Sequence, residues 1–189
     1  VDFIKKYKID IICLQETKTE DKFFPLDEFN KLGLVYSNIR GEKSYNGVAI
    51  LSRFNFKKKE NINWCGLKDS RHVFVVLSNN IVLHNFYVPA GGDLPDIKNN
   101  PKFKYKIDFL NEMALFLKNN GQRKIIVGDL NIAPFENDVW SHKQLLDIVS
   151  HTPLETKAFE KILKEATLID TIRENYKKSD KVYSWWSYR

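Results

Sequence analysis

The sequence predicts an α/β (α+β) sandwich with partly antiparallel sheets. Short apolar segments rich in Val, Ile and aromatic residues alternate with segments whose apolar residues recur at helical spacing. Two apolar segments, 71–78 and 80–89, meet at Asn79 and Asn80, which predict a hairpin turn and hence an antiparallel pair. Hairpin-joined strands mixed with helices are typical of layered α/β folds.

The predicted strands are short apolar runs bounded by polar or turn-forming residues: 10–16, 45–52, 71–78, 80–89 and 124–129. Helical patterns cover residues 1–8, read as the end of a helix, and residues 101–121. A further helix begins where Thr152, Pro153 and Glu155 form a predicted capping box. Its predicted apolar face comprises Leu154, Ala158, Phe159, Ile162, Leu163 and Ala166.

Composition favours one compact domain, residues 1–189, since 43% of the residues are hydrophobic. The net charge of +6 and the pI near 9.1 favour an anionic partner such as nucleic acid, although many basic proteins bind none. Cys13 and Cys65 form no C-x-x-C pair, so we expect reduced thiols in a cytoplasmic protein. No apolar run approaches the roughly 18 residues that span a bilayer, and no membrane partner is predicted.

Both ends of the chain lie within structured patterns. The chain lacks an initiator Met and opens in an amphipathic segment, and it closes on the aromatic segment 182–189. We therefore expect an internal piece of a longer protein.

Three predicted strands end in polar residues with catalytic potential. These are Glu16, then Asn85 and Tyr87, then Asp129 with Asn131. Carboxylate and amide oxygens suit a hard cation such as Mg²⁺ or Mn²⁺, which retains waters and binds one or two carboxylates together with substrate phosphate. Asp and Asn are also favoured in turns at strand ends, so each residue taken alone is more simply a turn residue.

Five motifs occur in order along the chain: LQETK (14–18), YNGVAILS (45–52), NFYVPAG (85–91), GDLNIAP (128–134) and YSWWSYR (183–189). In this order they resemble exonuclease III-type apurinic/apyrimidinic (AP) endonucleases of the endonuclease/exonuclease/phosphatase superfamily. The resemblance covers essentially the whole chain and implies the four-layer αββα sandwich of the DNase I-like type. It also implies an Asn before residue 1, and an Asp and an Asp-His pair after residue 189, so the 189 residues alone are expected to be nearly inactive.

The resemblance implies a role for each strand-end residue. Glu16 would bind the catalytic metal, Mg²⁺ with Mn²⁺ as an alternative, and Asp129 and Asn131 would belong to the same metal site. Tyr87 would position and stabilise the attacked phosphate. Asp129 would activate the water, and Asn131 would orient the phosphate and the nucleophile.

Other positions would face DNA by the same resemblance. Tyr45 and Asn46, placed on a loop, would contact the minor groove. Trp185 and Trp186 would form a wall against an extrahelical abasic sugar, although strand alternation makes one of them a core residue. Arg189 would lie on a DNA-inserting loop. A missing base lowers the unstacking cost of flipping a nucleotide out of the duplex, which suits an abasic site.

The implied function is DNA repair by metal-dependent hydrolysis. A monomer would cleave double-stranded DNA 5′ to abasic sites and would act as a 3′-to-5′ exodeoxyribonuclease at 3′ ends. Two alternatives remain: another phosphatase or phosphodiesterase of the superfamily, and a non-catalytic DNA-binding relative. The sequence does not decide the balance of endonuclease and exonuclease activity, the number of metal ions, or the choice between Mg²⁺ and Mn²⁺.

Overall fold

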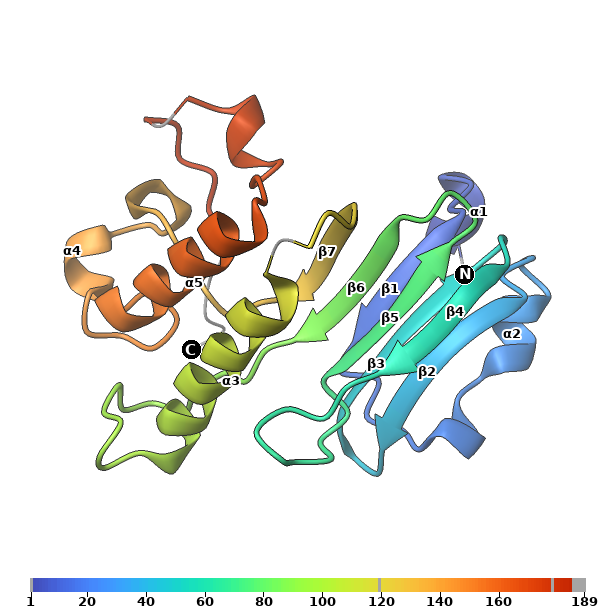
Figure 1. The fold of residues 1–189 in the computed structure, drawn as a ribbon, viewed down its shortest axis with the longest axis horizontal. Coiled ribbons are helices and arrows are strands. Elements are labelled where there is room, and N and C mark those ends of the chain that lie inside the picture. The colour runs from blue at the N-terminus through green and yellow to red at the C-terminus, as the bar shows by residue number, and fades with distance from the viewer. Residues whose placement is uncertain (1, 119, 178, 185–189) are drawn as a thin grey trace. The chain divides into compact units, whose positions relative to one another are not determined.

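A computed structural model describes residues 2–118, 120–177 and 179–184, and Figure 1 shows the course of the chain. The structure divides into two compact units, one of residues 1–87 and 121–130, the other of residues 88–120 and 131–189. Two sheets and several helices confirm the predicted mixed α/β class. The assignment of residues 1–189 to one domain stays a prediction. Within the described ranges, every helix is too short or too polar to cross a membrane.

The first unit contains both sheets. The three-stranded sheet is antiparallel and has the order β1 (Ile11–Gln15), β3 (Tyr45–Ser52), β2 (Tyr36–Glu42). The four-stranded sheet has the order β4 (Phe56–Asn61), β5 (His72–Leu77), β6 (Val82–Tyr87), β7 (Lys124–Asp129). Its strands are antiparallel except for the parallel pair β6 and β7, and β5 and β6 form the predicted hairpin. The short helices α1 (Asp2–Lys6) and α2 (Leu26–Asn30) and a 3₁₀ turn (Asp21–Phe23) complete the unit.

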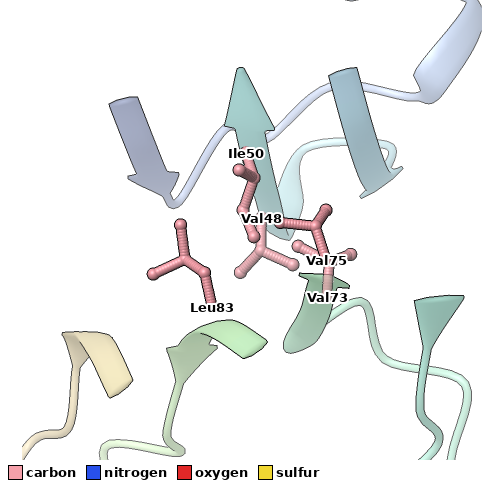
Figure 2. Close-up of a cluster of buried hydrophobic side chains, with 5 residues drawn as sticks. All are labelled: Val48, Ile50, Val73, Val75 and Leu83. Atoms are coloured by element: carbon pink, nitrogen blue, oxygen red, sulfur yellow. The ribbon is translucent and has the colours of Figure 1, made fainter. Parts of the chain in front are cut away.

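The core of the first unit lies between the two sheets. Figure 2 shows the buried cluster there, formed by Val48, Ile50, Val73, Val75 and Leu83. On the opposite face of β3, Ala49 and Leu51 pack with Ile4 of α1 and Leu34. Strand β3 is thus covered on both faces, which explains why its residues 48–51 form a continuous apolar run.

The second unit is built on two helices that pack against each other, α3 (Pro101–Leu117) and α5 (Pro153–Ala166). It also contains α4 (His142–Leu145) and two 3₁₀ turns, Glu136–Asp138 and Arg173–Asn175. The predicted capping box of α5 is confirmed, because the Thr152 side chain accepts from the Glu155 N–H and the Glu155 carboxylate accepts from the Thr152 N–H.

The predicted apolar face of α5 is wrong at its first residue. Leu154 is 49% exposed, whereas Glu155, Phe159, Ile162 and Ala166 are buried. The buried stripe begins at Glu155 because its carboxylate pairs with the buried ammonium group of Lys106 on α3. Successive helical residues are about 100° apart around the axis, so Leu154 is turned toward solvent.

Two buried histidines face each other across strands β5 and β6. The Nε2 atom of His72 lies 3.1 Å from the Nδ1 atom of His84. Burial lowers the pKa of His84 to about 3, with the charge of Lys124 adding to the effect, and burial also lowers the pKa of His72 well below its ordinary value. Both imidazoles are therefore neutral in the folded protein at physiological pH.

We expect this histidine pair to make the fold acid-sensitive. Unfolded histidine binds a proton near pH 6.5, but His84 in the folded state does so only near pH 3. The free energy of unfolding is therefore fully retained above pH 6.5 and decreases as the pH falls toward 3. At pH 5 the loss that His84 causes is about 2 kcal/mol. Urea unfolding at pH 7.5 and pH 5 should show a smaller acid-induced loss in His84→Gln than in the wild type. Equal losses in the two proteins would contradict the argument.

Candidate active site

Strand β1 ends in a left-handed turn that presents Glu16. The φ angles of Glu16 and Lys18 are +53° and +51°, a conformation that non-glycine residues adopt infrequently and that clusters at functional sites. Strand β3 holds the turn, because the N–H groups of Thr17 and Lys18 donate to the carbonyls of Gly47 and Asn46. At Gly47, with φ +97°, a Cβ atom would lie 2.1 Å from the Thr17 hydroxyl. The glycine of the YNGVAILS motif thus permits the approach of β3 to this turn.

The Glu16 carboxylate is ionised and accessible. Its side chain is 42% exposed and lies 2.7 Å from the Lys18 ammonium group. The hydrogen bond from Lys18 lowers the pKa of Glu16 below its usual value, and hydrogen bonding from Tyr87 and the charges of Lys18 and Arg71 act in the same direction. An exposed anionic oxygen of this kind can bind a hard cation.

Tyr87 and Asp129 are direct neighbours at the ends of parallel strands β6 and β7, where they are register partners. The close approach of the two strands requires Gly128. Its φ is +135°, and a Cβ atom there would lie 1.9 Å from the Phe86 carbonyl oxygen. The glycine of the GDLNIAP motif therefore allows Asp129 to stand beside Tyr87.

The Tyr87 hydroxyl remains protonated. Burial raises its pKa to about 12, and the charges of Glu16 and Asp129 and the hydrogen bond to Glu16 also raise the pKa, against the opposing charge of Arg71. A neutral phenol can donate a hydrogen bond to a phosphate oxygen without adding negative charge. The structure therefore brings together three of the predicted site residues, Glu16, Tyr87 and Asp129.

Arg71 is a site residue that the sequence did not reveal. Its buried guanidinium donates to the Asp69 carboxylate at 2.6 Å and to the Tyr87 carbonyl at 3.3 Å. Its Cζ atom lies 4.9 Å from the centroid of the Tyr87 ring, and its own carbonyl accepts from the Tyr87 N–H at 2.8 Å. Arg71 thus fixes the ring of Tyr87 and supplies a positive charge to the site. A lone Arg ahead of an apolar strand carries no motif, so only the strand pairing exposes this role.

Asn85 connects the two sheets of the first unit and is buried. Its Oδ1 atom accepts from the Gln15 amide at 2.7 Å, and its Nδ2 atom donates to the carbonyls of Leu14 and Ala49 at 2.9 and 3.0 Å. These bonds fix the end of β1 relative to β6. They explain why the polar residues Gln15 and Asn85 belong to the LQETK and NFYVPAG motifs.

The predicted loop position of Tyr45 and Asn46 is wrong, because both residues begin strand β3. Tyr45 is 61% exposed, and its DNA contact stays a prediction. Asn46 is only 2% exposed, and its amide donates to the Glu42 carboxylate and the Asp69 carbonyl at 2.7 and 2.8 Å. This burial conflicts with a direct DNA contact. Asn46 instead stabilises the turn of Glu16, because its carbonyl accepts from the Lys18 N–H. Its side-chain amide also holds Asp69, the residue that pairs with Arg71.

Asn131 belongs to the second unit and follows Asp129 by two residues. Its φ is +50°, and its Nδ2 atom donates to the carbonyl of Val88 at 3.0 Å. Val88 is the residue after Tyr87 along the chain. Asn131 is therefore tied to the segment that leaves β6. The predicted DNA-facing residues Trp185, Trp186 and Arg189 lie outside the described residues.

The donor set fits a hard divalent cation. In the part of the chain that the structure describes, no three His, Cys, Asp or Glu side chains gather as a metal-ligating group. A cation here would be held by Glu16, the accessible ionised carboxylate, and would keep waters and bind substrate phosphate. This is the binding mode expected of Mg²⁺-type ions at phosphate-transfer sites.

Comparison with known proteins gives a family match over residues 1–189, to the endonuclease/exonuclease/phosphatase family. An exodeoxyribonuclease of Bacillus subtilis is 28% identical over 199 residues, covering 100% of this chain and 73% of that protein. A DNA-(apurinic or apyrimidinic site) endonuclease of Dictyostelium discoideum is 28% identical over 195 residues. The match covers 99% of this chain but only 52% of the Dictyostelium protein.

Solved structures that superpose on this chain also include DNA-processing enzymes. An AP endonuclease from Archaeoglobus fulgidus superposes with a TM-score of 0.86 at 28% identity, covering 99% of this chain and 71% of that one. A 3′ phosphatase from Neisseria, bound to a product DNA hairpin, gives 0.84 at 25% identity, with 100% and 72% coverage. These similarities confirm the predicted DNase I-like fold class.

Proposed function

This chain belongs to the endonuclease/exonuclease/phosphatase family, and from that premise we propose that it hydrolyses DNA 5′ to abasic sites and removes nucleotides from 3′ ends. It is a DNA repair hydrolase of the exonuclease III and AP endonuclease type, as its relatives are. Like its family, it depends on divalent metal. The observation that supports the proposed site most strongly is the cluster of Glu16, Tyr87 and Asp129 at the ends of three strands.

Each residue of the cluster has chemistry that phosphodiester hydrolysis requires. A bound cation would neutralise charge that develops on the phosphate. Tyr87 is neutral at physiological pH because burial raises its pKa to about 12, so its hydroxyl donates a hydrogen bond to a phosphate oxygen and adds no competing charge. Asp129 accepts a proton from the attacking water. Asn131 orients the phosphate and the nucleophile with its amide.

The proposal also names the metal ion and the nucleic-acid partner. We assign Mg²⁺ as the cation, with Mn²⁺ able to replace it, because the oxygen donors suit hard ions. The substrate is double-stranded DNA with abasic sites or 3′ ends, and the net charge of +6 supports this through phosphate contacts. We assign Tyr45 to a DNA contact, which its exposed side chain supports. The protein acts as a monomer in the cytoplasm.

The test is cleavage of a 5′-labelled duplex that carries one reduced abasic site, by the full-length protein with Mg²⁺. A single nick 5′ to the site should appear, with a 3′-hydroxyl that a polymerase can extend. An undamaged duplex and addition of EDTA serve as controls. Release of phosphate from a phosphoinositide without cleavage of the duplex would assign the protein to another branch of the family, and DNA binding without cleavage would make it a non-catalytic relative.

A further inference from the structure

The second unit contains a fully buried ion pair between Lys106 of α3 and Glu155 of α5. The two side chains are 0% exposed, and Nζ lies 2.5 Å from Oε1. Removing two charges from water is costly, and well-packed apolar residues often serve stability as well as such a pair does. Stability alone is therefore a weak explanation for this pair.

The carboxylate end of the pair is satisfied by the start of α5. Glu155 accepts from the N–H of Ser150 at 2.9 Å, from the N–H of Thr152 at 3.1 Å and from the Thr152 hydroxyl at 2.6 Å. Glu155 would thus be hydrogen-bonded even without Lys106. The carboxylate fixes the helix start, and the helix start holds the carboxylate in place.

The ammonium end reaches the segments that follow the two site strands. Lys106 Nζ donates to the carbonyl of Asn131 at 2.7 Å and to the carbonyl of Ala90 at 3.2 Å. Together with Glu155, these acceptors match the three N–H bonds of an ammonium group, while the Ser150 hydroxyl is more distant at 3.4 Å. Ala90 lies in the NFYVPAG motif and Asn131 in the GDLNIAP motif.

The contact to Asn131 bears directly on the orientation of its amide. Asn131 has a left-handed backbone with φ +50°, which asparagine tolerates better than most L-residues but which its hydrogen bonds can still stabilise. Lys106 holds its carbonyl on one side, and the Val88 carbonyl accepts from its side-chain amide on the other. One contact holds the backbone of Asn131 and the other holds its side-chain amide, so together they help to define where that amide points.

We propose that Lys106 is a positioning residue that acts through Asn131, with Glu155 as the anchor that directs its ammonium group. Loss of the ammonium group would release the Asn131 carbonyl, and a misplacement of about 1 Å at a reacting centre can lower a rate about 100-fold. This inference rests on the proposed function, in which Asn131 orients the phosphate.

The test is a double-mutant cycle in the full-length protein, with single-turnover cleavage of an abasic duplex, DNA affinity and Tm as readouts. The paired variant Lys106→Met/Glu155→Gln removes both charges, so no unpaired charge is left buried. It is made in the wild type and in the Asn131→Ala background. Ile162→Val, a buried change on α5 away from the pair, is the matched control for lost stability.

We expect the paired variant to lower the single-turnover rate about tenfold or more in the wild type, and less than about twofold further in Asn131→Ala. Ile162→Val should lower Tm and leave the rate unchanged. If the paired variant does not fold, Lys106→Arg, which keeps the charge but moves the donors, enters the same cycle with the same expectation.

Three results would overturn the inference. A normal rate in the paired variant below its Tm would leave Lys106 a purely structural residue, and equal losses in both backgrounds would mean that it acts elsewhere. An unaffected Asn131→Ala would remove the residue through which Lys106 acts. Failure of the proposed function is distinct, because the wild-type protein would then not cleave the abasic duplex.

Discussion

Asp129→Asn in the full-length protein is expected to lower the single-turnover rate of abasic-site cleavage about 10²- to 10⁴-fold, the usual effect of losing a general base. The asparagine amide keeps the size of the side chain but cannot accept a proton from water. The fold should survive, since the substitution changes neither Gly128 nor the register of Asp129 with Tyr87. DNA binding should be unchanged or tighter, because a negative charge near the scissile phosphate is removed.

The measurement pairs single-turnover cleavage with a binding titration at fixed salt, since DNA affinity depends strongly on salt. Near-normal cleavage would reduce Asp129 to a turn residue. A parallel loss of cleavage and binding would indicate misfolding, and Tm would then fall as well.

Glu16→Gln is expected to raise the Mg²⁺ concentration for half-maximal cleavage by about tenfold or more. The substitution keeps the shape of the side chain but removes the charge that a hard cation needs. In the wild type, the pKa of Glu16 is held below its usual value by the hydrogen bond from Lys18, so the carboxylate is fully ionised at neutral pH.

Lys18→Gln is the matched control for this prediction. It removes the ammonium group that lies 2.7 Å from the carboxylate and leaves the carboxylate itself. The Mg²⁺ requirement should then be unchanged or lower, because a competing cation has been removed. A Mg²⁺ titration of Glu16→Gln that coincides with the wild type would exclude Glu16 from the metal site.

The fold could be predicted from the sequence where local pattern and tertiary packing agree. Strands β3 and β7 and the capping box of α5 carry strong local signals, and the structure has them where predicted. Four catalytic or metal-binding residues followed from a resemblance of motifs, and the structure places three of them, Glu16, Tyr87 and Asp129, in contact or electrostatic range. Their roles stay predictions.

The remaining features depend on contacts between distant parts of the chain. Arg71 contacts Tyr87 because their strands pair. Lys106 has the sequence character of an exposed residue, and its burial depends on the ion pair with Glu155 of α5. The same pairing turns Leu154 outward, against its hydrophobicity. The motif predicts a DNA contact for Asn46, yet its side-chain amide donates to Glu42 and Asp69 within the first unit. No spacing rule in the sequence encodes these partners.

The most direct test of the central claim, metal-dependent attack of water on the phosphate 5′ to an abasic site, is an isotope measurement. A single turnover of an abasic duplex is run with Mg²⁺ in ¹⁸O-labelled water, and both product ends are analysed by mass spectrometry. Hydrolysis predicts one ¹⁸O in the 5′-phosphate on the abasic sugar and an unlabelled 3′-hydroxyl on the other end. An unsaturated sugar on a 3′ end, formed without ¹⁸O in the phosphate and without need for Mg²⁺, would show β-elimination and contradict the account.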